Sequence, residues 1–145
     1  MKAKLCILGA VLSLMTAQQV WALQDFPKLS VIERSPFTPE FVLTNQSEIG
    51  LTPEQKQGIN AVTLDIQKRL AELKRIARDE TRDLDKIINQ ENADELQALN
   101  SLDKLLLRDR EYRRLQVTQL FKIKNILRPD QQKRLWEIKN IQMGR

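Results

Sequence analysis

The sequence lacks histidine altogether and has a single cysteine, Cys6, among its 145 residues. Zinc, nickel and cobalt sites are built from imidazole or sulfur ligands, and nucleophilic catalysis in most hydrolases needs a histidine base or a thiol. No glycine-rich phosphate loop and no EF-hand spacing occurs either. These absences argue against an enzyme, against a cofactor and against a metal site.

Aromatic residues make up only 5 % of the chain, and Gly 4 and Pro 5 are also few. A sheet protein of this length would need more β-branched, aromatic and turn residues. Charged residues, by contrast, make up 30 % of the chain. The composition therefore predicts one all-α domain.

Residues 1–22 have the pattern of a secretory signal peptide. Lys2 and Lys4 precede an apolar run from Leu5 to Met15, and in Val20-Trp21-Ala22 the two positions that a signal peptidase reads hold small or modest residues. The alternative, an uncleaved membrane anchor, needs about 20 apolar residues, more than this run provides. We therefore predict cleavage after Ala22, export from the cytoplasm and no membrane span afterwards.

Removing that segment also removes Cys6, so the exported chain forms no disulfide and depends on apolar packing. Without Lys2 and Lys4, the 24 basic residues fall to 22 against 19 acidic ones, a net charge of +3. So small an excess does not indicate nucleic-acid binding.

Residues 23–38 mix Pro27 and Pro36 with serines and scattered apolar residues, which predicts an extended arm, with disorder as the alternative. The helical domain is expected over residues 39–145. Thr38 and Pro39 form a cap-and-proline start for a short helix that ends by Gly50.

The strongest local signal is Leu51-Thr52-Pro53-Glu54-Gln55. Thr52 can cap a helix, Pro53 fits its first position, and Gln55 can complete a capping box. A second copy, Leu127-Arg128-Pro129-Asp130-Gln131, has arginine in place of the threonine. It predicts a last helix that starts at Pro129, ends before Gly144 and folds back beside the first turns of the long helix.

Two long helices are expected between these starts. From Thr52 to about Asn89, apolar residues recur every three or four positions, and a second helix capped by Asn92 runs to about Leu127. Its apolar stripe is Leu96, Leu99, Leu102 and Leu106, then a polar gap at Arg110 and Arg113, then Val117, Leu120, Ile123 and Leu127.

Nearly equal lengths and a short turn predict an antiparallel hairpin. Folding the chain about Asn92 places Leu73 near Arg110 and Ala77 near Leu106. The stripes are too wide for one hairpin to cover, which predicts a homodimer.

The signal peptide, the short helix, the hairpin and the paired motifs resemble the Spy/CpxP family of bacterial periplasmic proteins. The resemblance covers about Pro39 to Ile141, and its motif residues are Leu51, Thr52, Gln55, Leu127 and Gln131. It implies a cradle-shaped helical homodimer. Members of this family act as ATP-independent chaperones for unfolded periplasmic proteins, as regulatory partners of an envelope-stress sensor kinase, or as sensors of nickel, cobalt or zinc. The lack of histidine makes the metal-sensing branch unexpected here.

A shallow surface that mixes arginine with leucine suits a holdase-type chaperone, since unfolded clients expose apolar and often acidic segments. The expected client-binding residues are Arg69, Arg75, Arg78, Leu107, Arg110, Tyr112, Arg113, Arg114 and Leu115. Two alternatives stay open for the charged residues: an ordinary solvated helix face, and pairing of Arg110 and Arg113 with Glu72 and nearby acids. The alternative function is regulation of an envelope-stress sensor, and metal sensing is the third.

Overall fold

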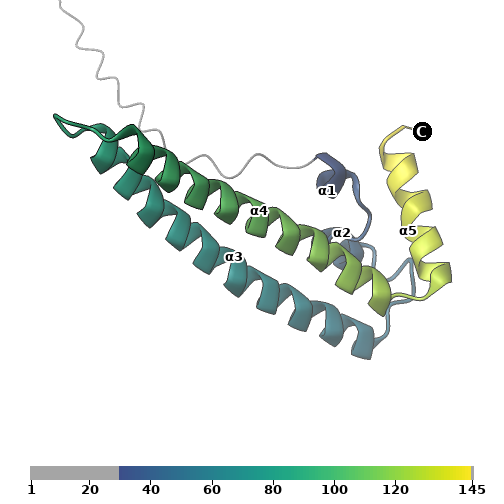
Figure 1. Cartoon of the computed structure of the whole chain (residues 1–145). Coiled ribbons are helices and arrows are strands. Elements are labelled where there is room, and N and C mark those ends of the chain that lie inside the picture. The colour runs from purple at the N-terminus through teal and green to yellow at the C-terminus, as the bar shows by residue number, and fades with distance from the viewer. Residues whose placement is uncertain (1–29, 145) are drawn as a thin grey trace, which may run out of the picture.

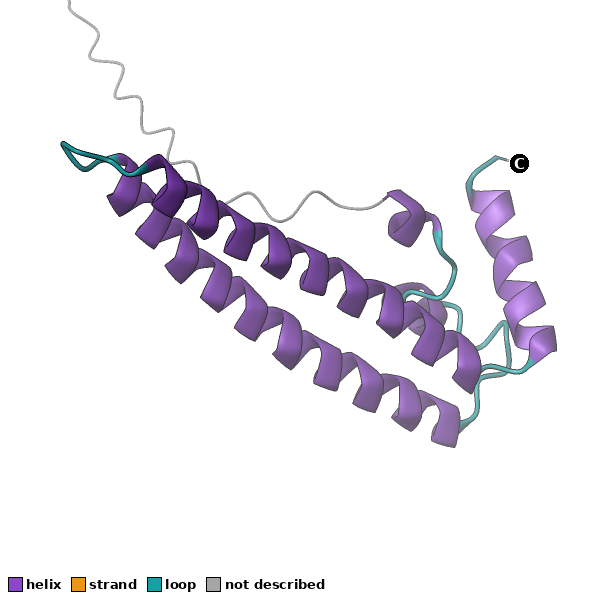
Figure 2. Ribbon diagram, viewed as in Figure 1, coloured by secondary structure: helices purple, strands orange, loops and turns teal. Residues whose placement is uncertain are grey.

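The computed structural model describes residues 30–144, and this part of the chain is helical throughout, with turns between the helices (Figures 1 and 2). The helices are α1 (Ser30–Arg34), α2 (Pro39–Thr44), α3 (Pro53–Ile88), α4 (Glu95–Ile126) and α5 (Pro129–Gln142). The predicted all-α class and the long antiparallel hairpin, formed by α3 and α4, are confirmed. The predicted signal peptide lies outside the described residues.

None of the helices between residues 30 and 144 has both the length and the apolar composition needed to cross a bilayer. We call the end of the hairpin near Pro53 and Ile126 its base, and the turn over residues 89–94 its tip. The short helices α1, α2 and α5 all lie toward the base. Near the tip, the described residues belong to the two long helices and the turn between them (Figure 1).

The start of α3 forms the predicted capping box. The backbone N–H of Gln55 donates to Thr52 Oγ1 at 3.2 Å, and the Thr52 N–H donates to Gln55 Oε1 at 3.1 Å. At the start of α5 only the second half of the box is made: the Arg128 N–H donates to Gln131 Oε1 at 2.9 Å. A guanidinium has no acceptor, so Arg128 pairs with Asp130 instead.

The side chains of Gln55 and Gln131 join the two helix starts. Gln55 Nε2 donates to Gln131 Oε1 at 2.9 Å, and Gln131 Nε2 donates to Gln55 Oε1 at 3.0 Å. Gln55 also donates to the Ile126 carbonyl, and Gln131 to the Ile49 and Gly50 carbonyls. Gln131 is only 1 % exposed, so these bonds lie inside the base.

The main apolar core surrounds this link. Its members come from the α1–α2 connection, α2, the residues before α3, α3, α4 and α5: Phe37, Val42, Ile49, Ile59, Ile123, Leu127, Leu135 and Ile138. Toward the tip, only a single row of buried or half-buried side chains on each long helix continues it.

Two predictions for the short segments need correction. Ser30–Arg34 form the helix α1 and are not extended, while residues 23–29 of the predicted arm lie outside the described part. Beyond its first turn, α5 does not run beside α3. Its later turns instead contact the segment over residues 33–48: Trp136 packs edge-on against Phe37, and Lys139 lies over the Phe41 ring.

The tip and the hairpin pairing also differ from the prediction. Asp94, not Asn92, caps α4, because its carboxylate accepts from the N–H groups of Leu96 and Gln97. Across the hairpin, Lys74 contacts the Tyr112 ring, so the pairing is displaced by about one helical turn from the predicted one.

The predicted apolar stripe of α4 is wrong over its first half. Leu96, Leu99, Leu102 and Leu106 are all exposed. The residues of α4 that are buried or half-buried toward α3 are Leu105, Arg108, Tyr112, Leu115 and Ile123. The sequence offers leucines on more than one face of this helix, and Tyr112 and Leu115 decide which face packs.

Replacing Gln131 by alanine should lower the free energy of unfolding by about 1–3 kcal/mol. The change leaves the amide of Gln55 and two backbone carbonyls without their buried partner. Urea unfolding followed by circular dichroism measures the effect. Gln57→Ala, at an exposed position of α3, is the matched control and should change stability little. Equal effects of the two variants would contradict a structural role for the Gln55–Gln131 link.

Candidate functional site

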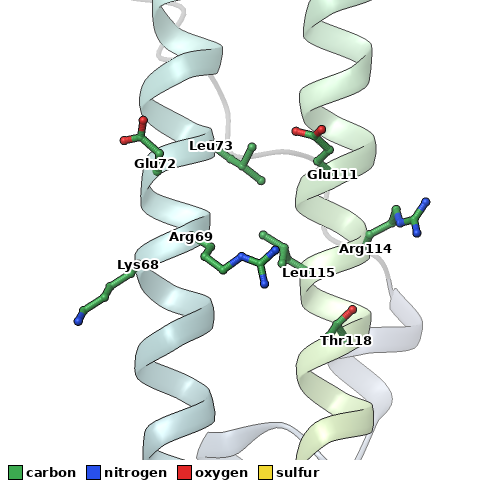
Figure 3. Close-up of a pocket in the computed structure, with 8 residues that line it drawn as sticks. All are labelled: Lys68, Arg69, Glu72, Leu73, Glu111, Arg114, Leu115 and Thr118. Atoms are coloured by element: carbon green, nitrogen blue, oxygen red, sulfur yellow. The ribbon is translucent and has the colours of Figure 1, made fainter.

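A groove of about 700 Å³ runs between the middle of α3 and the middle of α4. It is open to solvent and mixes charged, polar and apolar side chains. Its lining residues, drawn in Figure 3, are Lys68, Arg69, Glu72, Leu73, Glu111, Arg114, Leu115 and Thr118.

Leucine side chains form the floor of the groove. Leu73 from α3 and Leu115 from α4 both point into the space between the two helices (Figure 3). Arg69 reaches from α3 toward Leu115, so its methylene groups extend this apolar surface. Lys68 points away from α4, and Arg114 points away from α3, so that their charges flank the groove.

The two acidic side chains of the groove are already neutralised by arginines that do not line it. Arg75 donates two hydrogen bonds to Glu72, at 2.7 and 3.0 Å, and these bonds lower the pKa of Glu72. Arg108 donates to Glu111 at 2.9 Å and to Glu80 across the hairpin at 3.3 Å. The bond to Glu111 is the largest cause of the raised pKa of Arg108.

The three cations of the groove have no such partners. Lys68, Arg69 and Arg114 make no ion pair with any residue between 30 and 144. With Glu72 and Glu111 paired elsewhere, the groove presents a net positive charge around an apolar floor. An acidic group of a ligand would therefore meet cations that need not first break an existing ion pair.

The structure brings together only three of the nine predicted client-binding residues in this groove: Arg69, Arg114 and Leu115. Leu115 is largely buried and offers an edge of its side chain, whereas the two arginines are exposed.

Three others are engaged in contacts within the hairpin. Arg75 binds Glu72 and Asp79 along α3. Arg113 Nε donates to Asp109 at 2.7 Å, which raises the pKa of Arg113. Tyr112 is 9 % exposed and lies beneath the ammonium of Lys74, as part of the packing between α3 and α4.

The remaining three are exposed but do not line the groove. Arg78 and Arg110 form no ion pair within residues 30–144, and the Leu107 side chain is open to solvent. The alternative, pairing of Arg110 and Arg113 with Glu72 and nearby acids, holds in part: Arg113 pairs with a nearby acid, Asp109, whereas Glu72 pairs with Arg75.

The prediction missed five groove residues: Lys68, Glu72, Leu73, Glu111 and Thr118. Helical spacing alone shows which residues share a side of each helix. Residues 68, 69, 72 and 73 share one side of α3, and residues 111, 114, 115 and 118 share one side of α4, each at steps of three and four. Only the relative rotation of the two helices, which the spacing does not give, shows that these sides adjoin.

Within residues 30–144, no group of three or more acidic, histidine or cysteine side chains is arranged to hold a metal ion. Comparison with known proteins gives no family for the chain: no family model matches it, and no match was found among the curated proteins or the solved structures. The Spy/CpxP resemblance therefore stays a prediction, and the function is argued from the groove.

Proposed function

We propose that the protein is an ATP-independent, holdase-type chaperone of the periplasm, which binds unfolded or partly folded envelope proteins. The observation that carries this proposal is the groove between α3 and α4, where Arg69 reaches over a floor of leucine side chains and Lys68 and Arg114 flank it. None of these three cations forms an ion pair within residues 30–144. A client would be attracted by charge and then held by weak apolar contacts. Such binding needs no nucleotide, which suits a compartment outside the cytoplasm.

The shape of the groove suits a partner that varies in sequence. The groove is shallow, and it runs between two neighbouring helices without enclosing a ligand. Long arginine and lysine side chains can adjust to different clients, because each carries a charge at the end of a flexible apolar stem. Affinity per contact is then low, and a client can leave without an energy source.

We also propose that the active form is a homodimer. Five leucines of α4, Leu96, Leu99, Leu102, Leu106 and Leu107, are exposed, and a group of exposed apolar side chains often marks a protein–protein interface. The dimer would bring two grooves to one client and raise its apparent affinity.

Removing the two arginines of the groove should weaken chaperone activity without unfolding the protein. In Arg69→Ser/Arg114→Ser, the amount of protein needed to halve the aggregation of a denatured client should rise by about five- to thirtyfold, since each lost charge contact contributes about 0.5–1 kcal/mol. Light scattering of an aggregating client measures this.

The matched control for this loss of charge is Arg82→Ser/Lys86→Ser. Both residues lie on exposed positions of the same hairpin, away from the groove, and form ion pairs along α3. It removes the same net charge and should keep near-normal activity. Equal loss in both double variants would show a diffuse charge effect and would count against the groove.

Binding should also depend on the charge of the client and on salt. A peptide that alternates aspartate with leucine should bind more tightly than the same peptide with lysine in place of aspartate. Raising the salt from about 50 to about 500 mM should reduce this preference, because screening shortens the range of charge attraction. Fluorescence anisotropy with labelled peptides measures both effects. No suppression of aggregation, together with capture of one dominant envelope protein in a pull-down, would instead indicate a regulatory partner.

A further inference from the structure

Aromatic side chains gather at the base of the hairpin, where the α1–α2 connection, the last turns of α4 and the middle of α5 meet. Trp136 packs edge-on against Phe37, and the two ring centroids are 6.1 Å apart. Phe37, Phe121 and Lys124 are among the residues that line a small groove of about 130 Å³. Phe37 therefore joins Phe121 on α4 to Trp136 on α5.

The two outer rings of this group are exposed, although Phe37 between them belongs to the apolar core. Phe121 is 60 % exposed and Trp136 is 43 % exposed. The indole N–H of Trp136 makes no hydrogen bond to any residue between 30 and 144, whereas a tryptophan inside a protein usually pairs this group. Trp136 thus offers solvent an apolar ring with a free donor at its edge.

Two lysines add positive charge beside the rings. The Lys124 ammonium lies 5.6 Å from the centroid of the Phe37 ring. Lys133 is exposed on α5, three residues before Trp136, so that both side chains lie on one side of that helix. Neither lysine forms an ion pair within residues 30–144. We call Phe121, Lys124, Lys133 and Trp136, with Phe37 between the rings, the base patch.

Acidic side chains near the base patch are few and already paired. Residues 112–142 contain eight basic side chains and two acidic ones, Asp130 and Glu137. Arg128 pairs with Asp130, and Arg134 with Glu137. The tip has the opposite balance, with eight acidic and three basic side chains over residues 79–107. The end of the hairpin with the exposed rings is therefore the end that a negatively charged surface attracts.

We propose that the base patch binds the surface of a membrane that contains anionic phospholipid. Phe121 and Trp136 enter the headgroup layer, where an amphipathic ring keeps its apolar body toward the acyl chains and its N–H toward lipid oxygens. Lys124 and Lys133 carry their charges on flexible apolar stems and face the phosphates around the rings. Two rings and two lysines make a peripheral, reversible contact.

The composition of the base patch favours lipid over a folded partner protein. Lysine is depleted at protein–protein interfaces, whereas lysine beside tryptophan and phenylalanine is typical of surfaces that lie on membranes. The groove between Phe37 and Phe121, at about 130 Å³, is also too small to take a helix of a partner.

This inference goes beyond the chaperone proposal and does not depend on it. The base patch shares no residue with the groove between α3 and α4. A protein that binds vesicles without suppressing aggregation would contradict the chaperone proposal alone. A protein that suppresses aggregation without binding vesicles would contradict the membrane contact alone.

Vesicle binding tests the proposal on a chain that begins at Leu23, because the apolar run over residues 5–15 would itself enter a bilayer. The apolar core lies within residues 37–138, so this chain keeps it, and Trp136 becomes its only tryptophan. With vesicles of equal parts phosphatidylglycerol and phosphatidylcholine, the emission of Trp136 should shift to shorter wavelength and the protein should sediment with the lipid. Phosphatidylcholine alone should bind it at least about tenfold more weakly, and about 500 mM salt should remove the difference.

Matched substitutions at the two ends of the hairpin show whether the base makes the contact. Phe121→Ser should lower the vesicle partition coefficient about tenfold, whereas Ile88→Ser, at an equally exposed residue near the tip, should change it little. Lys133→Ser should lower it about fivefold, and Lys104→Ser, at an exposed position of α4 toward the tip, should not. All four positions are exposed, so the variants should keep the circular dichroism of the parent chain.

Several outcomes would overturn the proposal. One is a chain that does not sediment with phosphatidylglycerol vesicles, and another is equal loss of binding in the base and tip variants. If vesicles have no effect and removal of residues 23–29 moves the emission of Trp136 to longer wavelength, that segment of the chain covers the base patch instead. If the emission shifts with protein concentration in the absence of lipid, the patch binds protein.

Discussion

The hydrogen bonds between Gln55 and Gln131 hold the whole arrangement at one end. They tie the start of α5 to the start of α3, and through Ile49, Gly50 and Ile126 they also tie in the segment before α3 and the end of α4. Buried amides in low-dielectric surroundings are stable only when all their donors and acceptors are paired, so this link fixes the geometry of the base closely. The apolar core then forms around it.

Because the short helices all gather at the base, the rest of the hairpin has to stand as two helices side by side. Two helices can hide one stripe each, and every other side chain remains in contact with water. The groove and the exposed leucines of α4 are both consequences of this limit. Leu73 and Leu115 line the groove between the two helices, and Leu96, Leu99 and Leu106 are exposed in the described structure.

Local signals in the sequence predicted the starts of α2, α3 and α5 and the buried row of α3. Thr52, Pro53 and Gln55 act within a few residues of one another, and Ile59, Ile66 and Ala77 form the one apolar row that α3 offers, so no long-range information was needed. The buried row of α4 was not predictable in the same way. Leucines at 96, 99, 102 and 106 formed a better stripe than the row of Ser101, Leu105 and Arg108 that lies opposite α3. Arg108 faces inward because Glu80 on α3 pairs with it across the hairpin, which spacing along one helix does not reveal.

The same limit applies to the candidate site. Residue type alone grouped Arg69, Arg75, Arg113 and Arg114, and the structure separates them by their partners. Spacing along α4 indicates the pair of Asp109 with Arg113, four residues apart. Spacing along α3 would equally pair Lys68 or Arg69 with Asp65. That carboxylate instead lies 4.0 Å from Lys122 on α4, and Glu72 is taken by Arg75. Competition across the hairpin therefore leaves the groove cations without ion pairs.

The exposed leucines of α4 and the polar side chains between α3 and α4 both reduce what the hairpin gains from apolar burial. A hairpin that sets Arg108 and Tyr112 between its helices gains less from apolar burial there than one that sets leucines inward. Leucines on the outside contribute to stability only when another surface covers them. Any partner that binds the folded form alone stabilises it in proportion to the logarithm of its concentration. The tip of this hairpin is therefore the part whose stability depends most on what binds it, while the base is held by its own contacts.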